Sequence, residues 1–194
     1  MDAAGWSTQL LEAVGTQVRN YRKQLGMTAQ DLADACAELG LEIPVKAVTN
    51  IETGRRASLG VGELLVLARA LNVGPVGLVF PLGHRATVEA FPGREIPVWD
   101  AVAWFTEETP LEEPAPRGSA RATIDAFRMH AQAAYTAITS LRICEERRRT
   151  PGTSVVHAEA MLADDVRALH EIRSRMSASG LVLPPWPEGL PQAD

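Results

Sequence analysis

The sequence predicts a mainly α-helical protein with two helical regions and a short, different segment between them. Apolar residues recur every three or four positions before Pro81, and the same period returns after Ser119. Between them, short β-like runs and a proline-rich acidic stretch interrupt the helical pattern. The predicted divisions are a five-helix domain at 8–83, a hairpin, short helix and linker at 84–118, a helical hairpin at 119–178, and a proline-rich tail at 179–194.

The first two helices have recognisable ends. The first is expected over Leu10–Leu25, where apolar residues share one face, and Gly26 can end it because glycine tolerates a positive φ. Thr28 is expected to cap the second helix, with Asp31 three positions later completing an approximate capping box. Gly40 ends this second helix. The connection to the next helix is therefore several residues long.

Three more helices are expected before the domain ends. Pro44 suits the first turn of the third helix, which runs to Gly54, because the missing N–H of proline is not needed there. A fourth helix is predicted from Ser58 to Leu71, and a short fifth from Pro75 to Phe80. These lengths and spacings are typical of a compact helical domain.

The segment after the fifth helix changes character. Residues 86–91 and 95–99 are short β-like runs around the turn dipeptide Pro92-Gly93, which predicts a small hairpin. Asp100 is expected to cap a short helix over 101–108. The Pro-rich, acidic stretch that follows at 109–119 is interpreted as a linker.

The C-terminal region contains two long apolar stripes at helical spacing. A helix over Ser119–Arg149 would be about 46 Å long at 1.5 Å per residue, and a turn at 150–152 separates it from a second helix. One hairpin of this length is not expected to bury both stripes on itself, which favours a dimer; packing back on the N-terminal domain is the alternative. The residues expected at the dimer interface are Ile124, Phe127, Ala131, Ile138, Leu141, Leu162, Leu169 and Met176.

Three segments of the N-terminal domain occur in a recognisable order. VRNYRKQLGMTAQDLADACAELG is followed by IPVKAVTNIETGRR and then by LLVLARALNV. Together they resemble the xenobiotic-response-element (XRE) family of helix-turn-helix regulators, the phage-repressor or Cro-like type, and look most like members from actinobacteria. The resemblance covers about a third of the chain. It implies a lambda-repressor-like fold and a cytoplasmic, nucleoid-associated regulator of transcription that binds double-stranded DNA.

The third helix carries the residues expected to read bases. Val48 and Ile51 face inward by helical spacing, so the polar side faces outward. Lysine can donate to guanine O6 or N7, asparagine can pair with adenine, and valine can contact a thymine methyl group. The expected base-reading residues are Val45, Lys46, Thr49 and Asn50.

Phosphate contacts are expected around the same helix. Thr28 stands at a helix N-terminus, where hydroxyl and backbone N–H groups can bind an anion. The family usually has Gln directly after this position, whereas this chain has Ala29, followed by Gln30. The expected phosphate-binding set is Lys23, Thr28, Gln30, Arg55 and Arg56.

Arg22 and Glu52 are expected to form a structural ion pair. By the resemblance, these positions tie the first helix to the end of the third. Removing one partner of such a partly buried pair would leave the other uncompensated. A phosphate contact by Arg22 is the secondary interpretation.

Charge and cysteine content restrict the remaining possibilities. The net charge is −5, but residues 1–83 contain seven Lys and Arg against eight Asp and Glu, so most of the acidity lies after them. DNA binding depends on this local distribution. The four histidines lack helical zinc spacing and only two cysteines are present, so no metal, no cofactor and no disulfide framework is expected. No catalytic arrangement stands out, and no enzyme is predicted.

The expected function is a sequence-specific regulator, a homodimeric repressor on a palindromic operator. In the alternative reading, the C-terminal helices bind a partner protein. A small-molecule effector could bind in residues 85–118 or between the long helices. A membrane partner is not expected, because no stretch approaches the roughly 20 apolar residues that a spanning helix needs.

Overall fold

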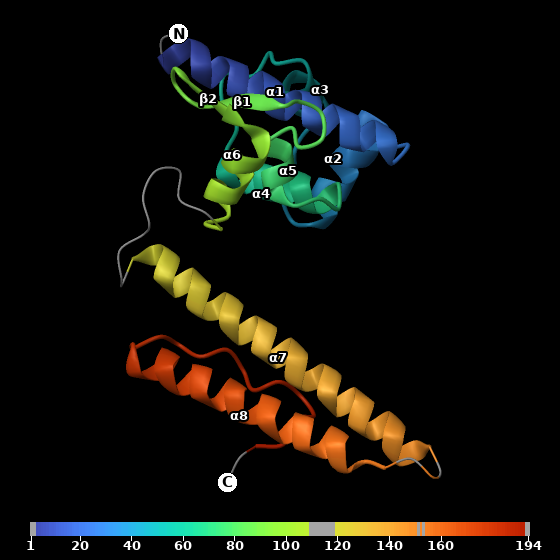
Figure 1. Ribbon diagram of the computed structural model, residues 1–194. Helices are drawn as coiled ribbons and strands as arrows, with labels where there is room; N and C mark the ends of the chain where they lie inside the picture. The colour runs from blue at the N-terminus through green and yellow to red at the C-terminus, as the bar shows by residue number, and fades with distance from the viewer. Residues whose placement is uncertain (1–2, 109–118, 151, 153, 193–194) are drawn as a thin grey trace. The chain divides into compact units, whose positions relative to one another are not determined.

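The computed structural model describes residues 3–108, 119–150, 152 and 154–192 (Figure 1). The chain divides into two compact units, Met1–Glu113 and Pro114–Asp194. The predicted mainly α-helical class is confirmed, with one small two-stranded sheet. Of the predicted linker at 109–119, residues 109–118 lie outside the described residues, and Ser119 caps the following helix.

Five helices form most of the first unit. Their bounds are α1 Ala3–Gln24, α2 Ala29–Glu38, α3 Val45–Glu52, α4 Val61–Ala70 and α5 Pro75–Val79. The core between them consists of aliphatic side chains at the predicted periodic positions, including the fully buried Val18, Leu32, Val48 and Leu67. The apolar stripes of the four longer helices therefore meet in one cluster.

Local hydrogen bonds cap the helices, and two helices begin at residues other than those predicted. Thr28 and Asp31 form the predicted capping box of α2. The first helix begins at Ala3 instead of Leu10, seven residues earlier. The fourth begins at Val61 instead of Ser58, because the Glu63 carboxylate accepts a hydrogen bond from the Gly60 N–H and stabilises the helix N-terminus there.

A β-hairpin and one further helix complete the first unit. Strands β1 Thr87–Phe91 and β2 Arg94–Pro97 pair antiparallel around the predicted turn, and helix α6 covers Val98–Phe105. Asp100 lies in the first turn of α6 and is not its cap, since the helix starts at Val98. Phe91 and Trp104 pack edge to face, with ring centroids 4.7 Å apart. The hairpin and α6 thus share a small core, to which α5 and Phe80 also contribute.

The second unit is an antiparallel pair of long helices, α7 Ala120–Arg149 and α8 Val156–Ala178 (Figure 1). On α8 the predicted stripe is buried: Leu162, Leu169 and Met176, which were expected at a dimer interface, are covered within the chain's own second unit. The hairpin therefore buries these α8 residues itself, so they are not available for the expected dimer interface.

The buried face of α7 also differs from the predicted seam. Ile124 and Phe127 remain 37% and 36% exposed and Ala131 is exposed, while Ile138 and Leu141 are half-buried. The fully covered positions are smaller or polar: His130, Ala137, Ser140 and Cys144. Small side chains allow two helices to approach closely, so α8 packs on this side and leaves the larger apolar residues beside it.

Polar contacts fix the C-terminal tail on the helical pair. Arg173 Nη1 donates to the carbonyl of Pro184 at 2.9 Å and lies 2.9 Å from His130 Nε2. The Arg173 guanidinium also lies over the Trp186 ring, 5.3 Å from its centroid. His130 must accept from this cation, so its neutral form is required.

The pKa of His130 is lowered, first by its burial and then by the neighbouring Arg173 charge. A lowered pKa means that the unfolded chain binds the proton more strongly, so the contribution to stability is present above about pH 6.5 and lost as the pH falls. We expect the urea midpoint of the second unit to fall between pH 7 and pH 5. It can be followed by Trp186 fluorescence in a chain with Trp6, Trp99 and Trp104 replaced by Phe. His130→Gln should weaken this dependence and the exposed His157→Gln should retain it; equal dependence in both variants would contradict the assignment.

Candidate DNA-binding interface

The contact between α1 and α3 determines where α3 lies in the first unit. At Gly15 the backbones approach so closely that an added Cβ would lie 2.0 Å from the carbonyl oxygen of Ile51. Any side chain larger than hydrogen would therefore force α3 away from α1. Sequence reasoning did not single out Gly15, although a glycine inside a long helix often indicates such close packing.

An ion pair fixes the same end of α3. Arg22 Nε donates to Glu52 Oε1 at 2.5 Å, and Nη2 donates to Glu52 Oε2 at 2.7 Å. The two side chains are only 12% and 6% exposed. Arg22 Nη1 also donates to the carbonyl of Met27 at 2.7 Å, so one guanidinium joins α1, the α1–α2 turn and α3. The hydrogen bond and charge of Glu52 raise the pKa of Arg22.

The outer face of α3 carries the predicted base-reading residues. Lys46 and Thr49 are exposed and Asn50 is half-exposed, three or four positions apart on one side of the helix. Thr49 Oγ1 donates to the carbonyl of Val45 at 3.0 Å, and its oxygen can still accept a hydrogen bond. Val45 itself packs partly against the core, so only part of its side chain is accessible.

Helix α3 follows a long connection from α2. Residues 39–44 separate the two helices, and Gly40 adopts a φ of +90°, which lets the chain turn after α2. Ile43 in this connection is 2% exposed and joins the core. The longer connection is thus anchored by an apolar side chain.

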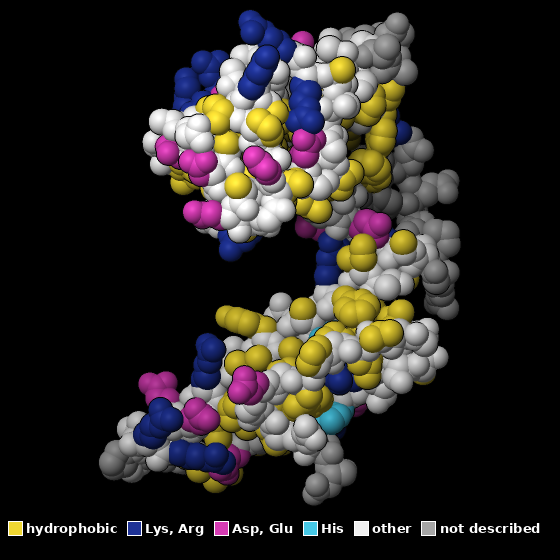
Figure 2. All heavy atoms as spheres, turned by 180° about the vertical axis from the view of Figure 1, so that it is seen from behind, with side chains coloured by type: hydrophobic (Ala, Val, Ile, Leu, Met, Phe, Trp, Pro, Cys, Tyr) yellow, Lys and Arg dark blue, Asp and Glu magenta, His cyan; other side chains and the backbone are white. Residues whose placement is uncertain are grey.

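The predicted phosphate-binding residues fall into two groups. Lys23 and Arg55 are exposed near the ends of α1 and α3. Arg56 instead pairs with Glu63 at 2.7 Å and is two-thirds buried, so it joins the α3–α4 loop to α4. Figure 2 shows Lys and Arg side chains gathered on the upper part of the first unit, with most of the Asp and Glu side chains below them.

Thr28 and Gln30 are already engaged at the start of α2. The Thr28 hydroxyl donates to Asp31 Oδ2 at 2.8 Å and accepts from the Asp31 N–H at 3.1 Å. Gln30 Nε2 donates to Asp34 Oδ1 at 2.8 Å. The hydrogen bond from the Thr28 N–H, followed by that from its hydroxyl, lowers the pKa of Asp31. A carboxylate therefore stays ionised where a phosphate contact was expected.

A short helix with an exposed polar side, seated across two others, defines the first unit as a helix-turn-helix DNA-binding fold. A helix-turn-helix family model, HTH_3, which describes the XRE/Cro-like family, matches residues 18–78. That family consists of DNA-binding regulators of transcription and not of enzymes. Neither the curated proteins nor the solved structures that were compared include a match.

Among the described residues, no three His, Cys, Asp or Glu side chains come together as metal ligands. In the same part of the chain, no helix is long and apolar enough to cross a membrane. The two cysteines, Cys36 and Cys144, are free and buried, one in each unit.

The close approach at Gly15 leads to a test of stability. We expect Gly15→Ala to lower the free energy of unfolding by about 1–3 kcal/mol, because a methyl group cannot fit against a helix carbonyl without moving the backbone. Gly62→Ala is the matched control: it lies inside α4 with nothing within 4 Å of its Cβ, and alanine should stabilise it by up to about 1 kcal/mol. Urea unfolding measures both; stabilisation in both variants would refute the close approach.

Proposed function

We propose that the chain is a homodimeric, sequence-specific repressor that reads a palindromic operator with α3. The observation that carries this proposal is the exposed polar face of α3 on a helix whose far end is held by Gly15, Arg22 and Glu52. A recognition helix needs both features, because base contacts require a rigid helix with accessible polar side chains. Repression follows if the bound dimer occupies a promoter.

The base-reading residues are Lys46, Thr49 and Asn50, with a partial contribution from the half-buried Val45. Lys46 suits a guanine and Asn50 an adenine in the major groove. Lys23 and Arg55 supply the phosphate contacts. Thr28, Gln30 and Arg56 contribute only where their present hydrogen bonds or ion pair rearrange on DNA.

Selection from a random duplex library supplies the operator for a binding test. On this operator, Lys46→Ala and Asn50→Ala should each weaken binding by about 10- to 100-fold, because one base contact contributes roughly 1–3 kcal/mol. Fluorescence anisotropy at physiological salt measures the affinity. Urea unfolding should show unchanged stability, since both side chains lie outside the core.

Lys23→Ala provides the contrast in the same assay. It should weaken binding to specific and to non-specific DNA about equally. The slope of log affinity against log salt concentration should fall by about one, because one phosphate contact is lost. Glu38→Ala, an exposed change on α2, serves as the neutral control. Full operator affinity in both Lys46→Ala and Asn50→Ala would show that α3 does not read the site.

The proposed dimer uses the apolar residues that α7 leaves uncovered. Ile124 and Phe127 are more than a third exposed, and Met129 and Tyr135 are 53% and 67% exposed. Figure 2 shows hydrophobic side chains spread along the visible face of the helical pair. A second copy that covers them would also supply a second α3, and the two recognition helices would then reach half-sites about 34 Å apart.

Phe127→Glu should convert the dimer into a monomer, because a carboxylate at the interface would be buried without a partner. Multi-angle light scattering of the full chain measures the mass, and circular dichroism checks that the helices remain. Val182→Glu is the control, since Val182 is 87% exposed on the tail and should leave the mass unchanged. A wild-type protein with monomer mass would instead favour a partner protein on these helices.

A further inference from the structure

The C-terminal tail, residues 180–192, returns along the helical pair after the end of α8 (Figure 1). Gly180 begins this return with a φ of +73°. Leu190, near the end of the tail, is 6% exposed and belongs to the core cluster of the second unit. An added Cβ at Gly189 would lie 3.6 Å from Leu141 Cδ2, so the tail also lies against α7. The tail therefore covers apolar side chains of both helices.

A single guanidinium from α8 contacts the middle of the tail twice. Arg173 Nη1 donates to the carbonyl of Pro184 at 2.9 Å, and the guanidinium lies over the Trp186 ring. The Trp186 indole N–H donates in turn to the carbonyl of Leu190 at 3.1 Å, which links the ring to the buried end of the tail. These contacts of the tail therefore depend on where the Arg173 guanidinium lies.

The same guanidinium meets His130 on the buried face of α7. Arg173 Nη1 lies 2.9 Å from His130 Nε2, and His130 is only 5% exposed. A guanidinium can only donate hydrogen bonds, so the imidazole must accept, and it does so only in its neutral form. A proton on His130 would place two cations in contact at a site shielded from water, where like charges repel strongly. Arg173 must then withdraw, because its long side chain can move while His130 is enclosed.

The other charged groups on α7, α8 and the tail do not replace Arg173 in this contact. Burial, followed by the charge of Arg173, lowers the pKa of His130. The neighbouring charged groups are paired elsewhere or exposed: Asp125 pairs with Arg128, Asp164 with Arg167, Asp165 accepts from Ser140, and Glu171, Arg175 and Glu188 are exposed. His170 packs on Trp186, with ring centroids 4.4 Å apart. A proton on His170 would be attracted to the indole face and would favour the bound tail, so His130 is the group whose protonation opposes it.

We propose that the C-terminal tail is a pH-sensitive latch, which covers the helical pair while His130 is neutral and is released when His130 is protonated. The proton binds Nε2 of His130, and Arg173 withdraws from the imidazole, from the Pro184 carbonyl and from the Trp186 ring. Helices α7 and α8 stay paired, which distinguishes the release from unfolding of the whole unit. The released tail uncovers the apolar face on which Leu190 lies. This latch lies within the second unit and does not depend on the proposed DNA-binding function.

The direction of the pH effect follows from proton linkage. The state with a free tail binds the proton more strongly, so the bound tail is favoured above about pH 6.5 and is lost as the pH falls. Each pH unit between the two pKa values of His130 shifts the equilibrium towards release by about tenfold.

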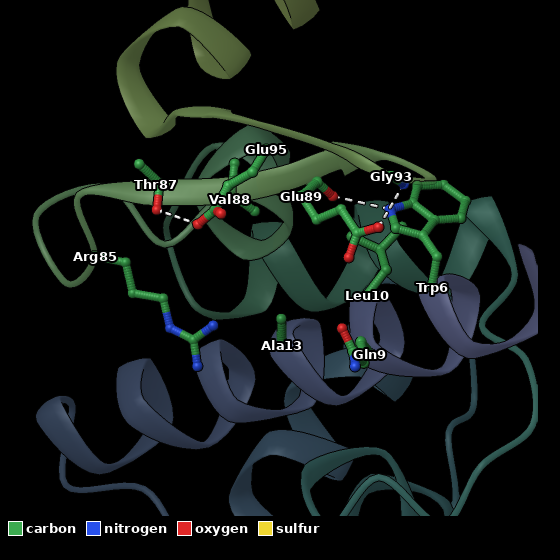
Figure 3. A pocket seen from close by; sticks show the side chains of 10 residues that line it. All are labelled: Trp6, Gln9, Leu10, Ala13, Arg85, Thr87, Val88, Glu89, Gly93 and Glu95. Atoms are coloured by element: carbon green, nitrogen blue, oxygen red, sulfur yellow. Dashed lines mark hydrogen bonds between the residues drawn. The ribbon is translucent and has the colours of Figure 1, made fainter. Parts of the chain in front are cut away.

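Acrylamide quenching of Trp186 fluorescence without denaturant follows the tail directly, because a released indole is more accessible to the quencher. The other tryptophans lie in the first unit, where Trp6 donates to the carbonyl of Glu89 at 2.8 Å (Figure 3). Trp6, Trp99 and Trp104 are therefore replaced by Phe in every protein compared. Between pH 7.5 and pH 5 the quenching constant should rise towards that of a free peptide of residues 179–194. The helical circular dichroism should stay unchanged over the same range.

Four variants assign the effect to particular side chains. His130→Gln keeps an acceptor for Arg173 but cannot be protonated, so its tail should stay bound at pH 5. Arg173→Gln removes the guanidinium, so its tail should be released already at pH 7.5 and show no further change with pH. His170→Gln and the exposed His157→Gln are the controls and should both keep the transition of the parent chain.

Each contrary result overturns the latch. An unchanged quenching constant down to pH 5 in the parent chain, or the same transition in His130→Gln, would show that His130 does not release the tail. A loss of helical signal at the same pH as the gain in quenching would show unfolding of the whole unit. If His130→Gln lacks the helical signal, Arg173→Gln decides: a tail that stays bound at pH 7.5 in that variant would refute the proposal.

Discussion

The clamp between α1 and the C-terminal end of α3 is the constraint on which the first unit depends. Gly15 meets the carbonyl of Ile51, and Arg22 meets Glu52, so both contacts grip the last turn of α3. A carboxylate at a helix C-terminus opposes the helix dipole, and α3 has no basic residue in that turn. The Arg22 guanidinium from α1 supplies the missing positive charge. The N-terminal turn of α3, with Lys46, is left to project outward.

This clamp contributes more to position than to net stability. Taking Arg22 and Glu52 out of water costs free energy that their attraction and hydrogen bonds only roughly offset. The bidentate geometry nevertheless allows one orientation, and the third bond from Arg22 to Met27 brings the α1–α2 turn into the same network. An apolar pair of equal volume could hold the helices together without defining their rotation. The ion pair defines it, and with it the side of α3 that faces outward.

Helical periodicity was sufficient to predict the first unit, because its core is built from aliphatic residues at regular spacing, such as Val18, Leu32 and Val48. The same reasoning was only partly right for α7, where Ile138 and Leu141 pack against the core but Ile124, Phe127 and Ala131 stay exposed. There the buried positions include His130 and Ser140, whose burial depends on partners across the hairpin: Arg173 for the histidine, and Asp165, which accepts from the Ser140 hydroxyl at 2.6 Å. No local pattern reveals such partners. The capping box was predicted at Thr28, but its consequence for phosphate binding was not. The Asp31 carboxylate accepts the hydrogen bonds of Thr28 that a phosphate would need.

The sequence of α1 departs from a regular amphipathic pattern at two positions, Gly15 and Gln17. Gln17 stands between the core residues Val14, Val18 and Tyr21, at spacings where an apolar side chain would bury well, and Gly15 replaces a better helix former. Each departure lowers the stability of the isolated fold. Glycine is explained by the approach of α3, which no larger residue permits. Glutamine is not explained by a hydrogen bond, since its buried Oε1 has no partner among the described residues. The two departures lie two positions apart, so they face nearly opposite sides of α1, and the side with Gly15 is the one that meets α3.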